Sequence, residues 1–262
     1  MASTKLLRSI IVDLRIAASF ATILPLGPSR PVDGGEVARA AWATPLAGLL
    51  VGLIGAAIYS IANGLGLTPG PSAVLALATT ILVTGALHED GLADTADGLG
   101  GGRTRERKLD IMRDSRIGTY GTCALIISFG LRWSALAAIA DPWVIAAALP
   151  AAHAASRAGV PAFMWFVRPA RSDGLSAAAG RPSAQSVAIA LGLGVLCLVF
   201  SVGPGKAVIG LILLSLAGLV VGRLAVRQIG GQTGDILGAL EQIGEIAILL
   251  LAAAVLHSGL RP

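Results

Sequence analysis

Charged residues are scarce in this sequence. Asp, Glu, Lys and Arg make up 13% of its 262 residues, whereas soluble domains contain roughly 25%. Hydrophobic residues account for 55% of the chain, and the mean hydropathy is +0.78. Several continuous apolar runs approach the ~20 residues that a helix needs to cross a bilayer. The scarcity of charge therefore excludes an ordinary soluble domain and predicts a polytopic membrane protein.

The sequence also lacks the features of several other classes of protein. Its two cysteines, Cys123 and Cys197, lie far apart in apolar runs, which excludes a disulfide framework. The short alternating segments of a β-barrel are absent, so the spans are expected to be helices, because a membrane segment must satisfy its own backbone hydrogen bonds. No Walker A, GxSxG, HExxH or Rossmann motif occurs, and the GLGGG at 98–102 does not follow a strand.

The predicted fold is all-α: a polytopic membrane bundle that forms a single integral-membrane domain, 1–262. The N-terminal stretch carries basic residues before an apolar segment, but Asp13 and Arg15 interrupt that segment. We therefore expect an amphipathic interfacial or re-entrant helix there rather than a cleaved signal peptide. Glycine and proline punctuation separates about seven transmembrane helices, which are expected at 41–62, 71–88, 118–140, 143–166, 184–202, 205–225 and 240–258.

The distribution of charge predicts the orientation of the chain. Sixteen of the 20 Lys and Arg residues precede span one, connect spans two and three or four and five, or end span six. With seven spans these segments share one side, which the positive-inside rule assigns to the cytoplasm. Topology therefore explains the net charge of +5, and no nucleic-acid partner is expected. Of the 15 acidic residues only Asp141 is assigned to the far side, which indicates a mixed-charge site at the inner surface.

The segment HEDGLADTADGLGGG, 88–102, places one histidine and four carboxylates directly after an apolar run. If the second span continues as a helix, Asp90, Asp94 and Asp97 follow at i, i+4 and i+7 and share one face, whereas Glu89 points elsewhere. Like charges at this spacing repel one another unless a cation lies among them. Oxygen ligands select hard cations, and Mg²⁺ is the usual partner of phosphate substrates. The alternative is a solvated helix end.

The basic segment that follows, 103–121, is a second candidate. Arg113 and Arg116 flank Ser115, and Asp114 lies beside them. Guanidinium groups next to carboxylates suit a phosphorylated substrate, because the arginines bind some of its oxygens and a metal binds others. Asp114 is therefore a further possible metal ligand, while Arg103 to Lys108 are explained equally well as a positive-inside loop.

Two later segments complete the set of candidates. The glycine-rich turn GGQTG at 230–234 precedes a helix that begins near Asp235, and free amides at such a start, near Thr233 and Gly234, can bind an anion. Asp235 is alternatively a metal ligand. His153 and Arg157 share a helix face inside span four, which indicates an anion pocket or a structural histidine. Arg171 in RPARSDGLS is also assigned to substrate binding, and Glu241 and Glu245 are intramembrane acids, which are functional candidates by default.

Several functions are compatible with these features. One candidate is a CDP-alcohol phosphotransferase. Such an enzyme uses membrane-embedded aspartates and releases a nucleoside monophosphate, although the spacing of its aspartates differs from the spacing in this sequence. A cation transporter would carry acids near the membrane midplane on broken helices. Here the acids cluster at one interface beside arginines, which favours chemistry on an anionic substrate.

At the same motifs the sequence resembles the cobalamin synthase family, the adenosylcobinamide-GDP ribazoletransferases. The resemblance covers essentially the whole length. It is carried by HEDGLADTADGLGGG, IMRDSRIGTYG and GGQTGDILGALEQIGE, together with AAHAASRAG, PARSDGL, ILPLG and PLAGLLVG.

The resemblance implies a reaction in which a hydroxyl of α-ribazole, or of its 5′-phosphate, attacks the diphosphate of adenosylcobinamide-GDP. GMP leaves, and adenosylcobalamin or its phosphate forms. The resemblance also implies Mg²⁺ as cofactor and a place in the cytoplasmic membrane of a prokaryote, with the active site facing the cytoplasm; a homo-oligomer is compatible with it. In this scheme Arg113 and Arg116 stabilise the leaving phosphate, and His88 or a carboxylate such as Asp94 is the base. The metal ligands would be Asp90, Asp94, Asp97, Asp114 and Asp235.

Overall fold

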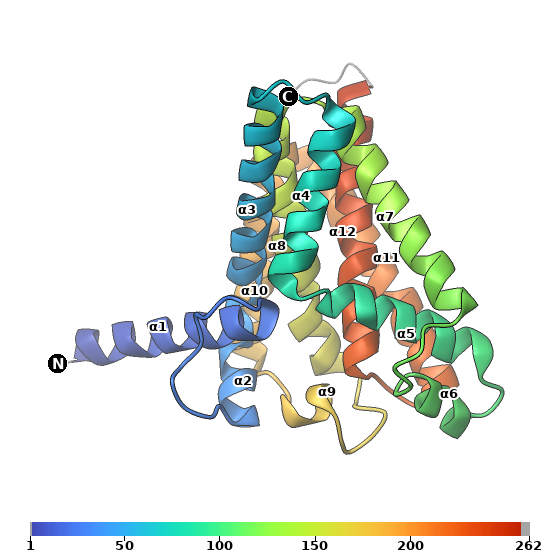
Figure 1. The fold of residues 1–262 in the computed structure, drawn as a ribbon. Coiled ribbons are helices and arrows are strands. Elements are labelled where there is room, and N and C mark those ends of the chain that lie inside the picture. Colours follow the sequence, from blue (N-terminus) through green and yellow to red (C-terminus); the bar gives the residue numbers. More distant parts are fainter. Residues whose placement is uncertain (1, 258–262) are drawn as a thin grey trace.

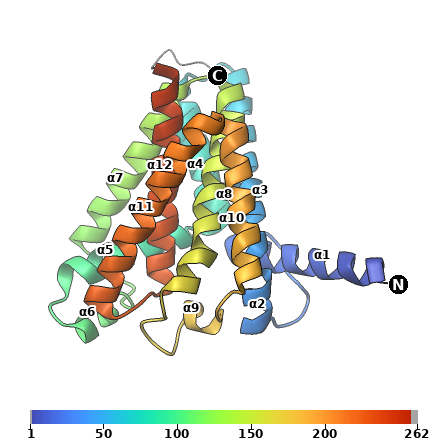
Figure 2. The same cartoon turned by 180° about the vertical axis from the view of Figure 1, so that it is seen from behind.

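Within residues 2–257, the part of the chain that this computed structural model describes, every regular element is a helix; side chains are described for 7–254. Consecutive long helices alternate in direction and pack into one bundle (Figures 1 and 2). Each overlaps one of the seven expected spans. The long helices are α3 (Thr44–Gly64), α4 (Pro69–Thr84), α7 (Thr119–Ile139), α8 (Pro142–Phe166), α10 (Ala184–Val202), α11 (Pro204–Ile229) and α12 (Gly234–His257).

The length and apolarity of the helices confirm a membrane bundle. Five described segments are long and apolar enough to cross a bilayer, and there is a sixth if α4 and the bent helix after it count as one span. Helix α8 is not among these segments. The last residue expected in the final span, 258, lies outside the described residues.

The remaining helices gather at one end of the bundle, which we call the charged end (Figure 1). This end carries most of the basic segments and most of the candidate site residues, whereas His153, Glu241 and Glu245 lie within the long helices α8 and α12. The elements that form it are α1 (Ala2–Ala21), α2 (Gly34–Ala40), the 3-10 turn η1 (Ala41–Ala43), α5 (Leu87–Gly101), α6 (Arg105–Ile111) and α9 (Leu175–Ala178).

Helix α1 runs across the charged end and projects beyond the bundle with its N-terminal half (Figure 1). This direction fits the interfacial helix expected from the sequence. Its C-terminal half is fixed by Asp13, which is buried and accepts hydrogen bonds from Arg39 Nε and Trp42 Nε1, both at 3.0 Å. The acid that interrupts the apolar segment is therefore the residue that attaches α1 to α2 and η1.

The second span does not continue past His88 as the sequence suggested. Helix α4 ends at Thr84, Gly85 and Ala86 take left-handed backbone conformations with φ of 63° and 56°, and α5 begins at Leu87. The chain bends by 87° at this break. Helix α5 therefore lies across the charged end instead of extending the span. The expected i, i+4, i+7 spacing still holds, because Asp90, Asp94 and Asp97 all lie on α5.

The bend can be tested by exchanging the side chains of its two left-handed residues. A Cβ at Gly85 would lie 2.6 Å from Ile23 Cγ2, and a left-handed non-glycine residue costs about 1–2 kcal/mol. Gly85→Ala should therefore lower the thermal midpoint in detergent. Ala86→Gly removes a side chain from a left-handed position and should leave the midpoint unchanged or raise it. Equal destabilisation by both variants would contradict the bend.

Candidate active site

The position of α5 is set by a close crossing with α12. A Cβ at Gly91 would lie 2.9 Å from the carbonyl oxygen of Asp235, and one at Gly238 would lie 3.3 Å from the Cα of His88. A side chain at either glycine would separate the two helices. The crossing places Asp90 and Asp94 of α5 beside Asp235, which lies more than a hundred residues later in the sequence.

The negative charge of these three aspartates is offset in part by Arg171. The pKa of Asp94 is raised to about 7, first by burial and then by the charges of Asp90, Asp235 and Asp97. Around Asp235, Thr233 Oγ1 donates a hydrogen bond of 3.1 Å to Oδ2, while Arg171 Nη2 is 3.9 Å from the same oxygen. Repulsion of this kind is what a bound cation relieves.

The described aspartates do not form a compact group of ligand atoms. Among the described residues, the group of three ligand atoms within 4.8 Å of one another belongs to His153, Glu241 and Glu245, not to the aspartates. Mg²⁺ commonly keeps several water ligands and uses one or two carboxylates together with substrate phosphates. Asp90, Asp94 and Asp235 fit this pattern.

Asp97, which the sequence predicts as a metal ligand, has different hydrogen-bond partners from its neighbours on α5. Its Oδ2 accepts a 2.7 Å hydrogen bond from the amide of Gly118, and its Oδ1 accepts one of 2.9 Å from Gly121. Both glycines approach so closely that an added Cβ would lie within 2.5 Å of the carboxylate. Asp97 therefore caps the N-terminus of α7, and the glycines of IGTYG make room for it.

The DSR segment is also arranged differently from the expectation. Asp114 forms a two-pronged ion pair with Arg116, with Oδ–N distances of 2.7 and 3.0 Å, and this pair lowers the pKa of Asp114 to about 2. Arg113 pairs with Asp173 at 2.5 Å, and Ser115 is exposed between them. Asp114 thus contacts an arginine rather than the carboxylates of α5, and the structure does not bring it into the aspartate group.

Arg171 reaches the site through a contact between two loops. The backbone of residues 168–170 pairs with the backbone of Gln232. The backbone N–H of Gln232 donates to Arg168 O at 2.8 Å, and its backbone carbonyl accepts from Ala170 N at 2.7 Å. Arg105 fastens this pair by donating to Ala170 O and Ile229 O. Arg105, which the sequence left to the positive-inside loop, therefore has a structural role.

Two of the three aspartates, Asp90 and Asp235, border a cavity with a volume of about 200 Å³. His88, Asp90, Arg157 and Asp235 line it, and Gly234 lies at the start of α12 beside them. Thr233 is fully buried, and its hydroxyl accepts from Ile236 N at 3.3 Å, so it caps α12 instead of facing the cavity. Burial lowers the pKa of His88.

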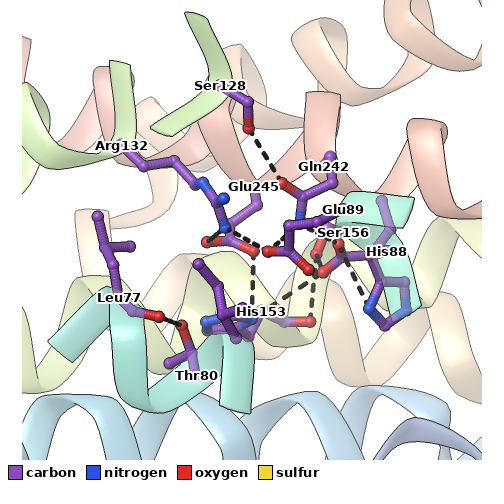
Figure 3. A network of polar contacts seen from close by, with 12 residues as sticks. Leu77, Thr80, His88, Glu89, Ser128, Arg132, His153, Ser156, Gln242 and Glu245 are labelled. Atoms are coloured by element: carbon purple, nitrogen blue, oxygen red, sulfur yellow. Dashed lines mark hydrogen bonds and ion pairs between the residues drawn. The ribbon is translucent and has the colours of Figure 1, made fainter. Parts of the chain in front are cut away.

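A buried network of charged side chains lies directly behind His88 (Figure 3). Arg132, only 2% exposed, donates from Nη1 to Glu89 Oε1 at 3.0 Å and to Glu245 Oε1 at 3.3 Å. Gln242 Nε2 also donates to Glu89, at 3.3 Å. Glu89 does point away from Asp90 and Asp94, as expected, because it joins α5 to α7 and α12.

The other half of the network involves the histidine and arginine of α8. Arg157 Nη1 lies 2.5 Å from Glu241 Oε1 and 2.9 Å from His153 Nδ1, while its Nη2 is 3.4 Å from His88 Nδ1. Arg157 thus contacts both the network and the cavity. His153 is 2% exposed and lies within the network, which agrees with its structural alternative rather than with direct substrate contact.

Guanidinium groups offset the negative charge in the close group of His153, Glu241 and Glu245. Both glutamates already contact an arginine, Arg157 or Arg132. Sequence reasoning identified the two glutamates only as general candidates and did not connect them with Arg132. The sequence did contain a signal for this pairing: Arg132 and the two glutamates lie inside apolar spans, where charged side chains need partners.

Comparisons with known proteins agree over almost the whole chain. The family described as cobalamin-5-phosphate synthase matches residues 13–253. An adenosylcobinamide-GDP ribazoletransferase of Bradyrhizobium diazoefficiens is 72% identical over 251 residues, which cover 96% of each chain. Proteins with the same name from Mesorhizobium japonicum and Azorhizobium caulinodans are 51% and 46% identical, over 96% and 92% of this chain and 96% and 95% of theirs. No solved structure matches the chain.

The different positions of Asp94 and Asp97 predict opposite effects on stability in the absence of divalent cations. The pKa of Asp94 exceeds its ordinary value of 3.8, so its ionisation costs the folded state stability as the pH rises from about 4 to 7. Asp94→Asn should raise the thermal midpoint at pH 8, and less so at pH 5. Asp97→Asn should lower it at both, because a helix cap typically contributes about 0.5–2 kcal/mol.

Thermal unfolding of the two variants in chelator-treated detergent solution measures this difference. Asp173→Asn, which alters an exposed carboxylate paired with Arg113, serves as the control and should change little. Destabilisation by Asp94→Asn at pH 8 would show that its carboxylate is compensated within the protein and needs no cation.

Proposed function

This chain belongs to the cobalamin-5-phosphate synthase family, and from that premise we propose that it acts as an adenosylcobinamide-GDP ribazoletransferase. Family membership favours this function over the CDP-alcohol phosphotransferase and the cation transporter. The observation that carries the proposal is the convergence of His88, Asp90 and Asp235 on one cavity, with Asp94 near the two other aspartates. Such a site meets the requirements of transfer from a diphosphate to a hydroxyl group.

The reaction exchanges one phosphorus–oxygen bond for another. A ribose hydroxyl of α-ribazole, or of its 5′-phosphate, attacks the phosphorus atom bound to the cobinamide. The bond from that phosphorus to the oxygen of the GMP portion breaks, and GMP leaves with its electron pair. The hydroxyl proton passes to a base on the protein. Adenosylcobalamin, or its 5′-phosphate, is the product.

We assign Asp90, Asp94 and Asp235 to binding of Mg²⁺. When bound, the ion would neutralise charge on the diphosphate and on the departing GMP. The raised pKa of Asp94 supports the assignment, because burial first, and then the charges of Asp90 and Asp235, disfavour its ionised form when no cation is bound. Arg171, 3.9 Å from Asp235, is placed to contact the same phosphates.

We assign His88 as the base. Burial lowers the pKa of its imidazole, so the ring is neutral near pH 7 and is able to accept a proton. Arg157 Nη2 lies 3.4 Å from Nδ1 and orients the ring.

The basic segments of the charged end support a cytoplasmic position for it, and we propose that the site faces the cytoplasm of a prokaryotic inner membrane.

The metal assignment predicts the activity of three single variants. Purified protein in detergent, supplied with Mg²⁺, adenosylcobinamide-GDP and α-ribazole, should release GMP. Asp90→Asn, Asp94→Asn and Asp235→Asn should each lower the rate by about 100-fold or more, because loss of one electrostatic contact to the reacting group typically costs that much. Asp173→Asn should retain full activity, and a chelator should abolish the activity of the wild-type protein. Full activity of all three variants would make the assignment wrong.

The assignment of the base predicts a separate effect. His88→Ala should slow turnover at least tenfold, since positioned acid–base groups contribute about 100-fold or more. Mg²⁺ should raise the thermal midpoint of this variant and of the wild-type protein alike, because no metal ligand has changed. Unchanged turnover removes His88 from the mechanism, whereas loss of the Mg²⁺ effect assigns it to the metal site.

A further inference from the structure

We propose that the apolar wall of the cavity binds the aromatic base of α-ribazole and thereby selects which base an acceptor nucleoside carries. This inference rests on the proposed function and deepens it. It assigns a specificity site to residues that lie outside every motif discussed above, on helices α1 and α2 and the turn η1.

The residues that line the cavity differ in chemistry from element to element. The charged and titratable ones, His88, Asp90, Arg157 and Asp235, come from α5, α8 and α12, which also contribute apolar residues such as Val160 and Met164. The lining residues from the N-terminal part of the chain are mostly apolar and form what we call the apolar wall. Its side chains include Ile16, Ala17, Phe20, Val37, Ala38 and Ala41.

A nucleoside has the same division as the cavity. Its ribose is polar and carries the attacking hydroxyl, which must lie beside the base and the metal site. The base of α-ribazole is a flat, uncharged bicyclic ring with two methyl groups, and it gains free energy by leaving water for an apolar surface. With the ribose at His88, the base extends toward α1 and α2.

The volume of the cavity distinguishes the acceptor from the donor. About 200 Å³ is less than the roughly 300–1,000 Å³ typical of pockets for drug-sized ligands. It suits one part of a nucleoside and excludes a corrin ring, which is larger than a typical drug. The corrinoid must therefore remain outside, so that only its diphosphate approaches the aspartates.

Small side chains create the space in this wall. Ala17 and Ala41 are buried, at 4% and 8% exposure, so a larger residue at either position would extend into the cavity. The wall is held in place by the contact of Asp13 with Arg39 and Trp42. Because this contact attaches the wall to the rest of the bundle, the alanines of the wall set the size of the base that fits.

Two substitutions change the wall in opposite directions. Ala17→Val narrows the cavity, and Val37→Ala widens it. The matched control is Ala18→Val: Ala18 is the next residue on α1 and is also buried, but it lines a separate cavity with Leu14 and Arg15. Thermal unfolding of each variant shows that the fold is retained.

The experiment measures kcat and KM for GMP release with three acceptors: α-ribazole, the benzimidazole nucleoside without the methyl groups, and a nucleoside with a larger tricyclic base. Ala17→Val should raise the KM for α-ribazole at least tenfold and shift preference toward the unmethylated base. Val37→Ala should shift preference toward the tricyclic base. The KM for adenosylcobinamide-GDP should change less than twofold in both, and Ala18→Val should behave as wild type.

Unchanged acceptor preference in both cavity variants overturns the proposal, as does an equal effect of Ala18→Val. A rise in the KM for adenosylcobinamide-GDP alone would place the corrinoid, not the base, against this wall, and would also overturn it. Failure of the proposed function gives a distinct result, because the wild-type protein would then release no GMP with any acceptor.

Discussion

The close crossing of α5 and α12 at Gly91 and Gly238 is the contact on which the site depends. It brings the carboxylates of α5 beside Asp235 and places His88 at the cavity. It is possible only because the chain bends by 87° between α4 and α5, which lays α5 across the bundle. Gly91 follows Asp90 in the first motif, and Gly238 follows Leu237 in the last. The close approach of the two backbones is sufficient to explain why both positions are glycine, without any contact with substrate.

A buried ion-pair network stabilises this arrangement against the repulsion within the site. Arg132 and Arg157 contact three glutamates from α5 and α12, and Arg157 also reaches His88. Removing one partner from such a network is strongly destabilising, because the remaining charge is left unpaired in a medium of low dielectric. The network therefore fixes the start of α5, while Asp94 further along the helix is half-buried among other carboxylates.

The four acids of one short segment consequently have different surroundings. Glu89 is buried against Arg132, Asp90 borders the cavity, Asp94 is half-buried among other carboxylates, and Asp97 caps α7. The fifteen-residue helix α5 thus presents acids to α7, to α12 and to the cavity. The site is assembled between α5, α12 and the loops, and its apolar wall is supplied by the N-terminal helices.

The sequence by itself determined the all-helical membrane fold, the seven long helices and the shared end of the charged residues, because hydropathy and helical period are local properties. It also predicted Asp90, Asp94 and Asp235 as metal ligands; the structure places the three near one another, and their binding of a metal stays a prediction. Only the tertiary structure decided that Asp97 and Asp114 have other partners, that Glu89 pairs with Arg132, and that α1 forms a wall of the cavity. These outcomes depend on a bend and a helix crossing, which are set by contacts between residues far apart in the chain.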